Sequence, residues 1–104
     1  MMADTAMALQ VWIDTRSEPG QTVLTPYIKS AQAIQVDYSM SLSMNGKSGK
    51  SRINQGGKVN AAAATPTALS RMRIHLRQED ACDIELVLRN GGKELGTYHF
   101  DCQR

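Results

Sequence analysis

The chain has 104 residues, a length that suits one domain with a modest core. Its hydrophobic content of 41% and its frequent turn residues indicate a folded globular protein and exclude a disordered chain. The formal net charge of +2 is too small by itself to indicate a nucleic-acid-binding protein. No apolar run approaches the ~20 residues that span a bilayer, so no membrane association is expected.

The N-terminus is predicted to lie outside the folded domain. Residues 1–7 are expected to be a disordered segment or an expression remnant, and residues 8–104 to form the domain. Met1–Leu9 has neither a charged n-region nor a continuous apolar h-region, so it is not an intact signal peptide. A signal peptide that was cleaved off before residue 1 remains an alternative.

Alternation of apolar and polar residues, which is typical of β-strands, recurs along the chain. Glycine, proline and asparagine clusters such as Glu18–Gly20, Gly56-Gly57 and Asn90–Gly92 predict turns between the strands. Four alanines in Asn60–Thr65 raise the alternative of one helical turn, which Pro66 disfavours. The pattern predicts an all-β chain, a β-sandwich of about seven antiparallel strands. The candidate strands are Leu9–Asp14, Thr22–Lys29, Ile34–Met44, Lys50–Asn54, Lys58–Ala62, Arg71–Arg77, Asp83–Arg89 and Glu94–Asp101.

The two cysteines fall at the outer ends of the last predicted hairpin. Pairing this hairpin around residues 91–93, with Asn90 opposite Glu94, places Cys82 opposite Cys102. Opposed antiparallel residues have Cα separations that suit a disulfide. The sequence therefore favours a Cys82–Cys102 disulfide over two free, partly buried thiols. Such a bridge indicates an oxidising compartment, for example the periplasm.

The sequence contains no complete catalytic or metal-binding motif. Gly46–Ser51 looks like a phosphate-binding loop, but Met44 stands where the motif needs glycine and no helix is predicted to follow. His75 and His99 lack zinc-ligand spacing and are predicted to be surface residues. Nothing supplies a Ser-His-Asp arrangement. We therefore expect neither an enzyme nor a cofactor.

The charges are strongly segregated along the chain. Between Tyr38 and Gln78 every charged residue is basic, whereas the flanking regions contain five basic and ten acidic residues. Segregation of this kind creates a field that attracts an acidic or polar partner. The candidate partner-binding residues are Lys47, Lys50, Arg52, Lys58, Arg71, Arg73 and Arg77.

Two parts of this basic segment differ in what they indicate. Lys47, Lys50 and Lys58 are equally consistent with a solubilising surface. In Arg71–Arg77, alternation predicts that the arginines share one strand face with His75, and the planar guanidinium suits recognition of carboxylates and amides. Carboxylates on neighbouring strands remain able to neutralise them. Because exposed aromatic residues for base stacking are not predicted, a polypeptide or acidic polysaccharide is favoured over nucleic acid.

Several short motifs, taken in order, resemble one known family. Ser48-Gly49-Lys50-Ser51, Asn54-Gln55, Ala68–Met72, Asp83–Leu88 and Asn90-Gly91-Gly92 are similar to segments of the curli-assembly inhibitors CsgC and CsgH. The resemblance covers roughly residues 22–100 and is closer to the CsgH branch.

The resemblance implies an immunoglobulin-like β-sandwich in the periplasm of a curli-producing bacterium. It further implies a monomeric, ATP-independent chaperone whose positive surface keeps an unfolded, acidic, CsgA-like amyloid subunit from polymerising. The Cys-x-Cys motif of CsgC-type members is missing, since Ala33–Val36 occupies its place, so no redox function carries over. The alternative is an adhesion or interaction module that binds a folded partner or an anionic glycan.

Overall fold

The computed structural model describes residues 9–47, 49–77 and 79–102, and the predicted N-terminal segment, residues 1–7, lies outside them. The described residues form two antiparallel sheets of four strands each. No helix among these residues is long and apolar enough to cross a membrane. The strands are β1 (Leu9–Glu18), β2 (Gln21–Ser30), β3 (Ile34–Gly46), β4 (Gly49–Ala61), β5 (Thr67–Ala68), β6 (Met72–Ile74), β7 (Ala81–Asn90) and β8 (Lys93–Asp101).

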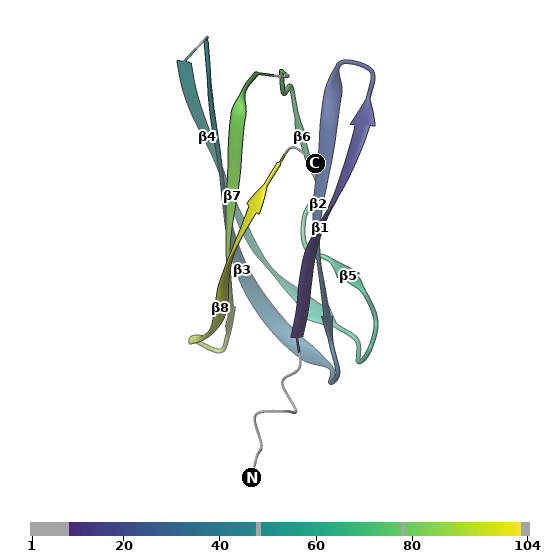
Figure 1. Ribbon diagram of the computed structural model, residues 1–104. Coiled ribbons are helices and arrows are strands. Elements are labelled where there is room, and N and C mark those ends of the chain that lie inside the picture. Colours follow the sequence, from purple (N-terminus) through teal and green to yellow (C-terminus); the bar gives the residue numbers. More distant parts are fainter. Residues whose placement is uncertain (1–8, 48, 78, 103–104) are drawn as a thin grey trace.

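The two sheets face each other as the layers of a sandwich (Figure 1). In the first sheet, β2 is central, with β1 on one side and the short strands β5 and β6 on the other. The second sheet has the order β4-β3-β7-β8, so β4 and β8 are its edges. The predicted all-β, immunoglobulin-like sandwich is confirmed, with eight strands in place of about seven.

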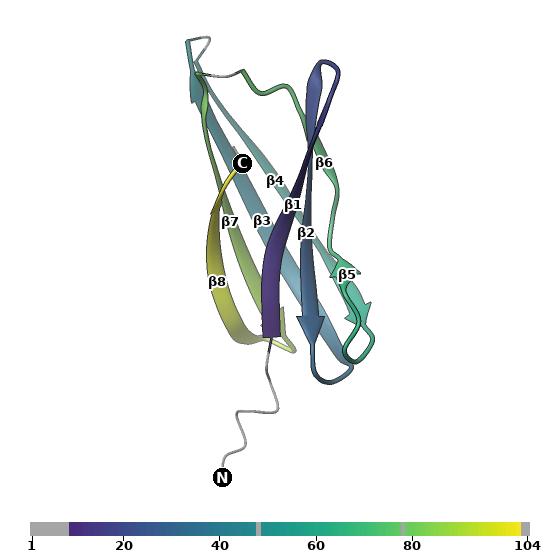
Figure 2. The same cartoon turned by 45° about the vertical axis from the view of Figure 1, so that its right-hand side comes forward.

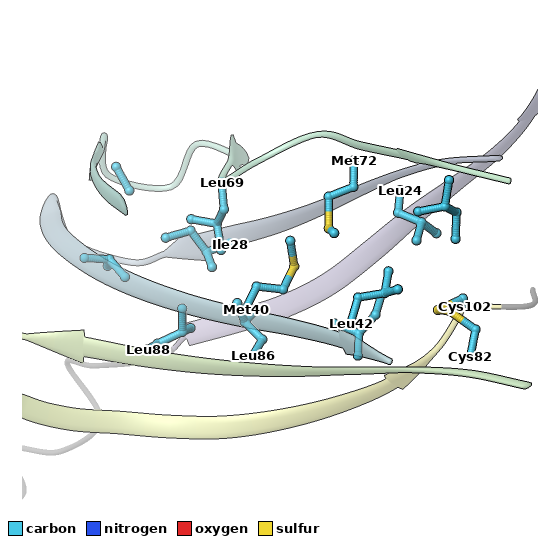
Figure 3. Packing of buried hydrophobic residues seen from close by; sticks show 14 residues of the cluster. Leu24, Ile28, Met40, Leu42, Leu69, Met72, Cys82, Leu86, Leu88 and Cys102 are labelled. Carbon is cyan, nitrogen blue, oxygen red and sulfur yellow. A yellow bond between two sulfur atoms is a disulfide. The ribbon is translucent and has the colours of Figure 1, made fainter. Parts of the chain in front are cut away.

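The core lies between the inner faces of the two sheets (Figure 3). Strict alternation in β3 and β7 buries one side of each strand, because side chains two residues apart share a face. β2 and β6 supply the facing layer, including Leu24, Ile28 and Met72. The fully buried aliphatic side chains in this core are Leu24, Ile28, Val36, Leu42, Ile84, Leu86 and Leu88.

The β7–β8 hairpin joins the two cysteines, as its alternation predicts. Ile84 pairs with Phe100 and Leu86 with Tyr98, in the expected register. Cys82 and Cys102 form a disulfide with their Cα atoms 5.3 Å apart, and the Cys102 backbone N–H donates a hydrogen bond to the Cys82 carbonyl. The disulfide lies at one end of the core (Figure 3).

The turn of this hairpin differs from the prediction. Asn90 pairs with Lys93, not with Glu94, and a bulge between Leu88 and Arg89 restores the outer register. Gly91 and Gly92 form the turn with φ values of 58° and 87°, a region that glycine adopts readily. A bulge adds one unpaired residue to a strand, so a shorter loop and the same outer pairing coexist.

β4 is one strand of 13 residues, where the sequence predicts two strands separated by a turn at Gly56-Gly57. Both glycines are extended and pair with β3. A Cβ atom on Gly57 would lie 3.1 Å from the Tyr38 ring, so the glycine gives space to a neighbouring aromatic side chain. The prediction of a turn there was wrong because the glycine serves packing between strands.

Of two smaller predictions, one is confirmed and one changes. The alanine-rich segment after β4 contains no helix among the described residues, and the Ala64 N–H donates a hydrogen bond of 2.6 Å to the Ser30 carbonyl. β6 is confined to Met72–Ile74, shorter than the predicted strand Arg71–Arg77. The shortness of β6 affects where the arginines of the predicted strand lie.

Candidate functional site

The basic residues of β4 project from the outer face of the second sheet. Alternation turns Ile53 and Val59 toward the core and leaves Lys50, Arg52 and Lys58 exposed on the opposite face. Lys47 precedes β4 in the turn that follows β3 and is also exposed. The strand therefore carries a line of cations along an edge of the sandwich.

A row of small polar residues separates Lys50 and Arg52 from the carboxylates that β7 and β8 carry on the same sheet face. The outward positions of β3 include Ser39, Ser41 and Ser43, which we call the serine row, and they lie between β4 and β7. On the far side of this row, β7 and β8 carry the exposed acidic residues Asp83, Glu85 and Asp101.

Among the described residues, one β4 cation has an acidic neighbour within ion-pair distance. Asp37 is the charged residue of the outward β3 positions, and its Oδ1 lies 3.8 Å from the Lys58 Nζ, with both side chains largely exposed. Among the described residues, Lys50 and Arg52 form no ion pair. Exposed pairs contribute at most about 1 kcal/mol, so all three cations remain available.

Arg71 and Arg73 lie on the outer face of the first sheet. Met72 and Ile74 are buried between and beside them, which fixes both arginines on the solvent side. Arg73 pairs with Val23 of β2. The two guanidinium groups therefore belong to a different sheet face from the cations of β4.

Acidic residues of β1 share this face with the two arginines. Arg71 and Arg73 line a shallow pocket of about 80 Å³ with Asp14, Arg16 and Glu18, across the central strand β2. The Glu18 carboxylate accepts a hydrogen bond of 3.1 Å from Gln21, and no ion pair joins Asp14 or Glu18 to either arginine within the described part of the chain. The arginines are near carboxylates without being paired to them.

Arg77 is separated from the other arginines. Its N–H donates a hydrogen bond of 3.0 Å to Asp80 Oδ2, and its carbonyl accepts one of 3.0 Å from the Asp80 N–H. This places Arg77 with Lys50 in the lining of an open cleft of about 230 Å³. His75 lies between the two groups, with Nδ1 2.7 Å from the Gly20 carbonyl oxygen. The predicted single arginine row is thus divided between two places.

The cations nevertheless gather on one side of the sandwich. β4 is an edge of the second sheet, and β5 and β6 are an edge of the first (Figure 2). The Ser70 hydroxyl, between β5 and β6, donates a hydrogen bond to the Gln55 side chain of β4 and so links these edges. We call this the basic side; it carries Lys47, Lys50, Arg52, Lys58, Arg71, Arg73 and Arg77.

Comparison with known proteins identifies the family. Residues 2–99 match the family described as thin aggregative fimbriae synthesis protein, Tafi-CsgC. The chain belongs to this CsgC family. No curated protein sequence matches the chain closely enough to count as a relative.

Two solved structures share the fold of this CsgC-family chain. The solution structure of R. palustris CsgH has a TM-score of 0.76 at 18% identity, covering 92% of this chain and 94% of CsgH. The E. coli curli protein CsgC has a TM-score of 0.74 at 16% identity, covering 93% of this chain and all of CsgC (100%). The fold and the family membership agree with the resemblance of the sequence motifs.

The sequence reasoning missed an aromatic pair near the arginines of this CsgC-family chain. Trp12 of β1 and Tyr27 of β2 pair across the strands, with ring centroids 5.6 Å apart and ring planes 10° apart. Tyr27 also lines the pocket of Arg71 and Arg73, so the aromatic pair adjoins the charged face. The two-residue spacing that puts Trp12 on the same face of β1 as Asp14 and Arg16 was the signal that could have revealed it.

These surfaces offer donor groups that suit reversible binding. Among the described residues, no group of three or more His, Cys, Asp or Glu side chains is placed to hold a metal ion. The basic side offers guanidinium and ammonium donors on exposed, adjacent edges. Such donors bind carboxylate-bearing partners through charge-assisted hydrogen bonds.

Proposed function

We propose that this protein is a periplasmic, non-enzymatic, ATP-independent chaperone that delays amyloid formation by curli subunits through its basic side. The observation that carries the proposal is the gathering of the basic residues on adjoining edges of the two sheets, in a chain that belongs to a curli-assembly family. The disulfide supports an oxidising compartment such as the periplasm.

The mechanism follows from exposed charge. The exposed cations of β4 and the arginines of the first sheet attract an unfolded acidic subunit over several ångströms before contact. Each exposed contact contributes at most about 1 kcal/mol, so the complex is transient and depends on several contacts. Contacts of this kind compete with the in-register strand pairing that begins a cross-β fibril. The subunit remains soluble without being folded.

Charge reversal on the basic side tests this proposal. The double variant Arg71→Glu, Arg73→Glu should lose most of the delay in a dye-monitored fibrillation assay of a curli subunit, since both residues are exposed. The matched control is Arg89→Glu, Lys93→Glu, which changes the net charge equally on β7 and β8, away from the basic side.

The control variant should keep the delay, and circular dichroism should show that both variants fold. An unchanged delay in the Arg71→Glu, Arg73→Glu variant, at low and at physiological salt, contradicts the proposed role of these arginines. Absence of any delay by the wild-type protein removes the chaperone function altogether.

A second candidate function is an adhesion module that binds an anionic glycan or a folded partner. The stacked Trp12–Tyr27 pair beside Arg71 favours it, because aromatic faces and guanidinium groups together suit sugar rings with acidic substituents. An adhesin shows saturable binding of fixed stoichiometry, whereas the chaperone acts on an unfolded subunit with little affinity for folded proteins. Calorimetric titration with an acidic glycan separates the two.

A further inference from the structure

β4 is a long edge strand, and no described segment pairs with its outer backbone. All 13 residues of β4 pair with β3 on one side. On the other side, no backbone hydrogen bond from the described turns and loops reaches Gly49–Ala61, and β5 and β6 pair with β2 instead. An edge of this length is a ready template for a further strand.

The direction of the free backbone groups follows from the ladder. The Cys102 N–H donates to the Cys82 carbonyl, so this pair is of the hydrogen-bonded type. Hydrogen-bonded and non-hydrogen-bonded pairs alternate along antiparallel strands, and the register is continuous from β7 through β3 to β4. The N–H and C=O groups that point away from β3 therefore belong to Lys50, Arg52, Asn54, Gly56, Lys58 and Asn60.

Three of these outward-pointing residues, Lys50, Arg52 and Lys58, are the cations of β4. Their charges bear on whether a second copy of this chain can pair with the edge. Two β4 edges paired antiparallel about Asn54 place Lys50 opposite Lys58, and pairing about Gln55 places Arg52 opposite Lys58. Like charges directly opposite each other destabilise a strand pair, whereas opposite charges stabilise it. The two registers that overlap β4 most fully are therefore disfavoured for self-association, and an acidic strand is favoured.

We propose that β4 is a docking edge, at which an extended acidic polypeptide segment adds as a further antiparallel strand of the second sheet. The inference rests on the proposed function and deepens it by naming the mode of binding. Backbone hydrogen bonds give the complex its geometry, and carboxylates opposite the cations give it selectivity. A segment held in this way has one edge occupied and no longer adds to a fibril through that edge.

The positions of the cations specify the spacing of the acidic residues. A partner strand that runs antiparallel to β4 meets Lys58 first, Arg52 six residues later and Lys50 two residues after that. Carboxylates at positions i, i+6 and i+8 of the segment therefore face all three cations on the outer face of the sheet. Moving the middle carboxylate by one residue turns it to the opposite face.

Amide hydrogen exchange of the complete wild-type protein tests the docking edge directly. The probe is a synthetic threonine- and asparagine-rich peptide as long as β4, with glutamates at i, i+6 and i+8. On addition of this peptide, the amides of the outward-pointing residues, Lys50 to Asn60 in steps of two, should gain protection, whereas those of the intervening residues are already bonded to β3. A peptide of the same composition with the middle glutamate at i+5 should bind about two- to fivefold more weakly.

A pair of variants separates backbone pairing from charge. Asn54→Pro removes one outward N–H without breaking the β3–β4 ladder, because proline is tolerated where a strand's N–H faces solvent. Asn54→Ala removes the same side chain and keeps the N–H. The proline variant should lose peptide binding and the alanine variant should keep it, with equal net charge in both.

The outcomes distinguish this inference from the proposed function. Salt-sensitive delay of fibrillation with no gain of protection in the outward amides overturns the docking edge and leaves the chaperone proposal standing. Equal protection of outward and inward amides also overturns it. Because the exchange measurement uses the wild-type chain, the test holds even if Asn54→Pro fails to fold.

Discussion

At the scale of single residues, the disulfide is the feature with the clearest energetic consequence. Cys82 and Cys102 are buried and separated by 20 positions in the sequence. A cross-link over a loop of this size raises stability mainly by restricting the unfolded chain. Its contribution therefore exceeds what the packing of two small side chains supplies.

We expect the double variant Cys82→Ala, Cys102→Ala to lose about 3 kcal/mol of unfolding free energy. Urea denaturation followed by circular dichroism measures the difference. The wild-type protein in a strong reductant should fall to a similar value, because it loses the same cross-link. Identical midpoints for the variant and the oxidised wild type would contradict a stabilising bridge.

At the scale of elements, the strands differ sharply in how well they are held. β3 pairs along its length with β4 and along most of it with β7, and both β3 and β7 bury one face in the core. β5 and β6 pair with β2 over two and three residues only. Local opening of a protein costs least where paired and buried contacts are fewest.

Amide hydrogen exchange of the protein alone should therefore be slowest in the interior of β3 and β7 and fastest, among the strands, in β5 and β6. Nuclear magnetic resonance resolves these amides individually. The inner part of β2 provides a comparison, because it is central in the same sheet as β5 and β6. Equal protection of β6 and β3 would show that the first sheet is held by contacts other than its strand pairing.

At the scale of the whole molecule, the charge segregation of the sequence becomes a separation in space within the second sheet. The cations of β4 lie at one edge of this sheet and carboxylates such as Asp101 lie at the other, whereas Arg71 and Arg73 share the outer face of the first sheet with Asp14 and Glu18. Interactions between exposed charges fall off over the Debye length, which decreases from about 30 Å at 0.01 M salt to about 8 Å at 0.15 M.

The proposed chaperone activity should accordingly weaken with salt. Between these two ionic strengths, we expect the protein concentration that gives half of the maximal delay of fibrillation to rise severalfold, because steering acts over a shorter distance. The Arg71→Glu, Arg73→Glu variant should show a smaller salt dependence. A delay that is independent of salt would indicate that apolar contacts or backbone pairing govern the encounter.

Sequence alternation predicted much of this fold, because burial of one strand face leaves a period of two. It placed Ile34–Met44 in a strand and predicted the pairing of Cys82 with Cys102, both confirmed in the structure. The extended Gly56-Gly57 in β4 was missed, since it depends on a Tyr38 ring that only the paired strand supplies.

The candidate site was predictable in its residues but not in its arrangement. The absence of acidic residues between Tyr38 and Gln78 identified the cations. Their division over two sheet faces depends on sheet order, and the place of Arg77 depends on its hydrogen bonds with Asp80. Contacts between residues distant in sequence decide both, and a single sequence contains no direct record of them.

The serine row of β3 has a consequence for crowded assemblies. Because two strand spacings, together about 10 Å, separate β4 from β7, Lys50 and Arg52 do not neutralise the carboxylates of β7 and β8, whereas Lys58 pairs with Asp37 of β3. This sheet face therefore has a positive edge at β4 and a negative edge at β7 and β8. We expect each copy bound to a polyanion by its lysine-bearing edge to turn its carboxylates outward. The outward carboxylates of neighbouring bound copies then form a negatively charged surface that repels further acidic chains.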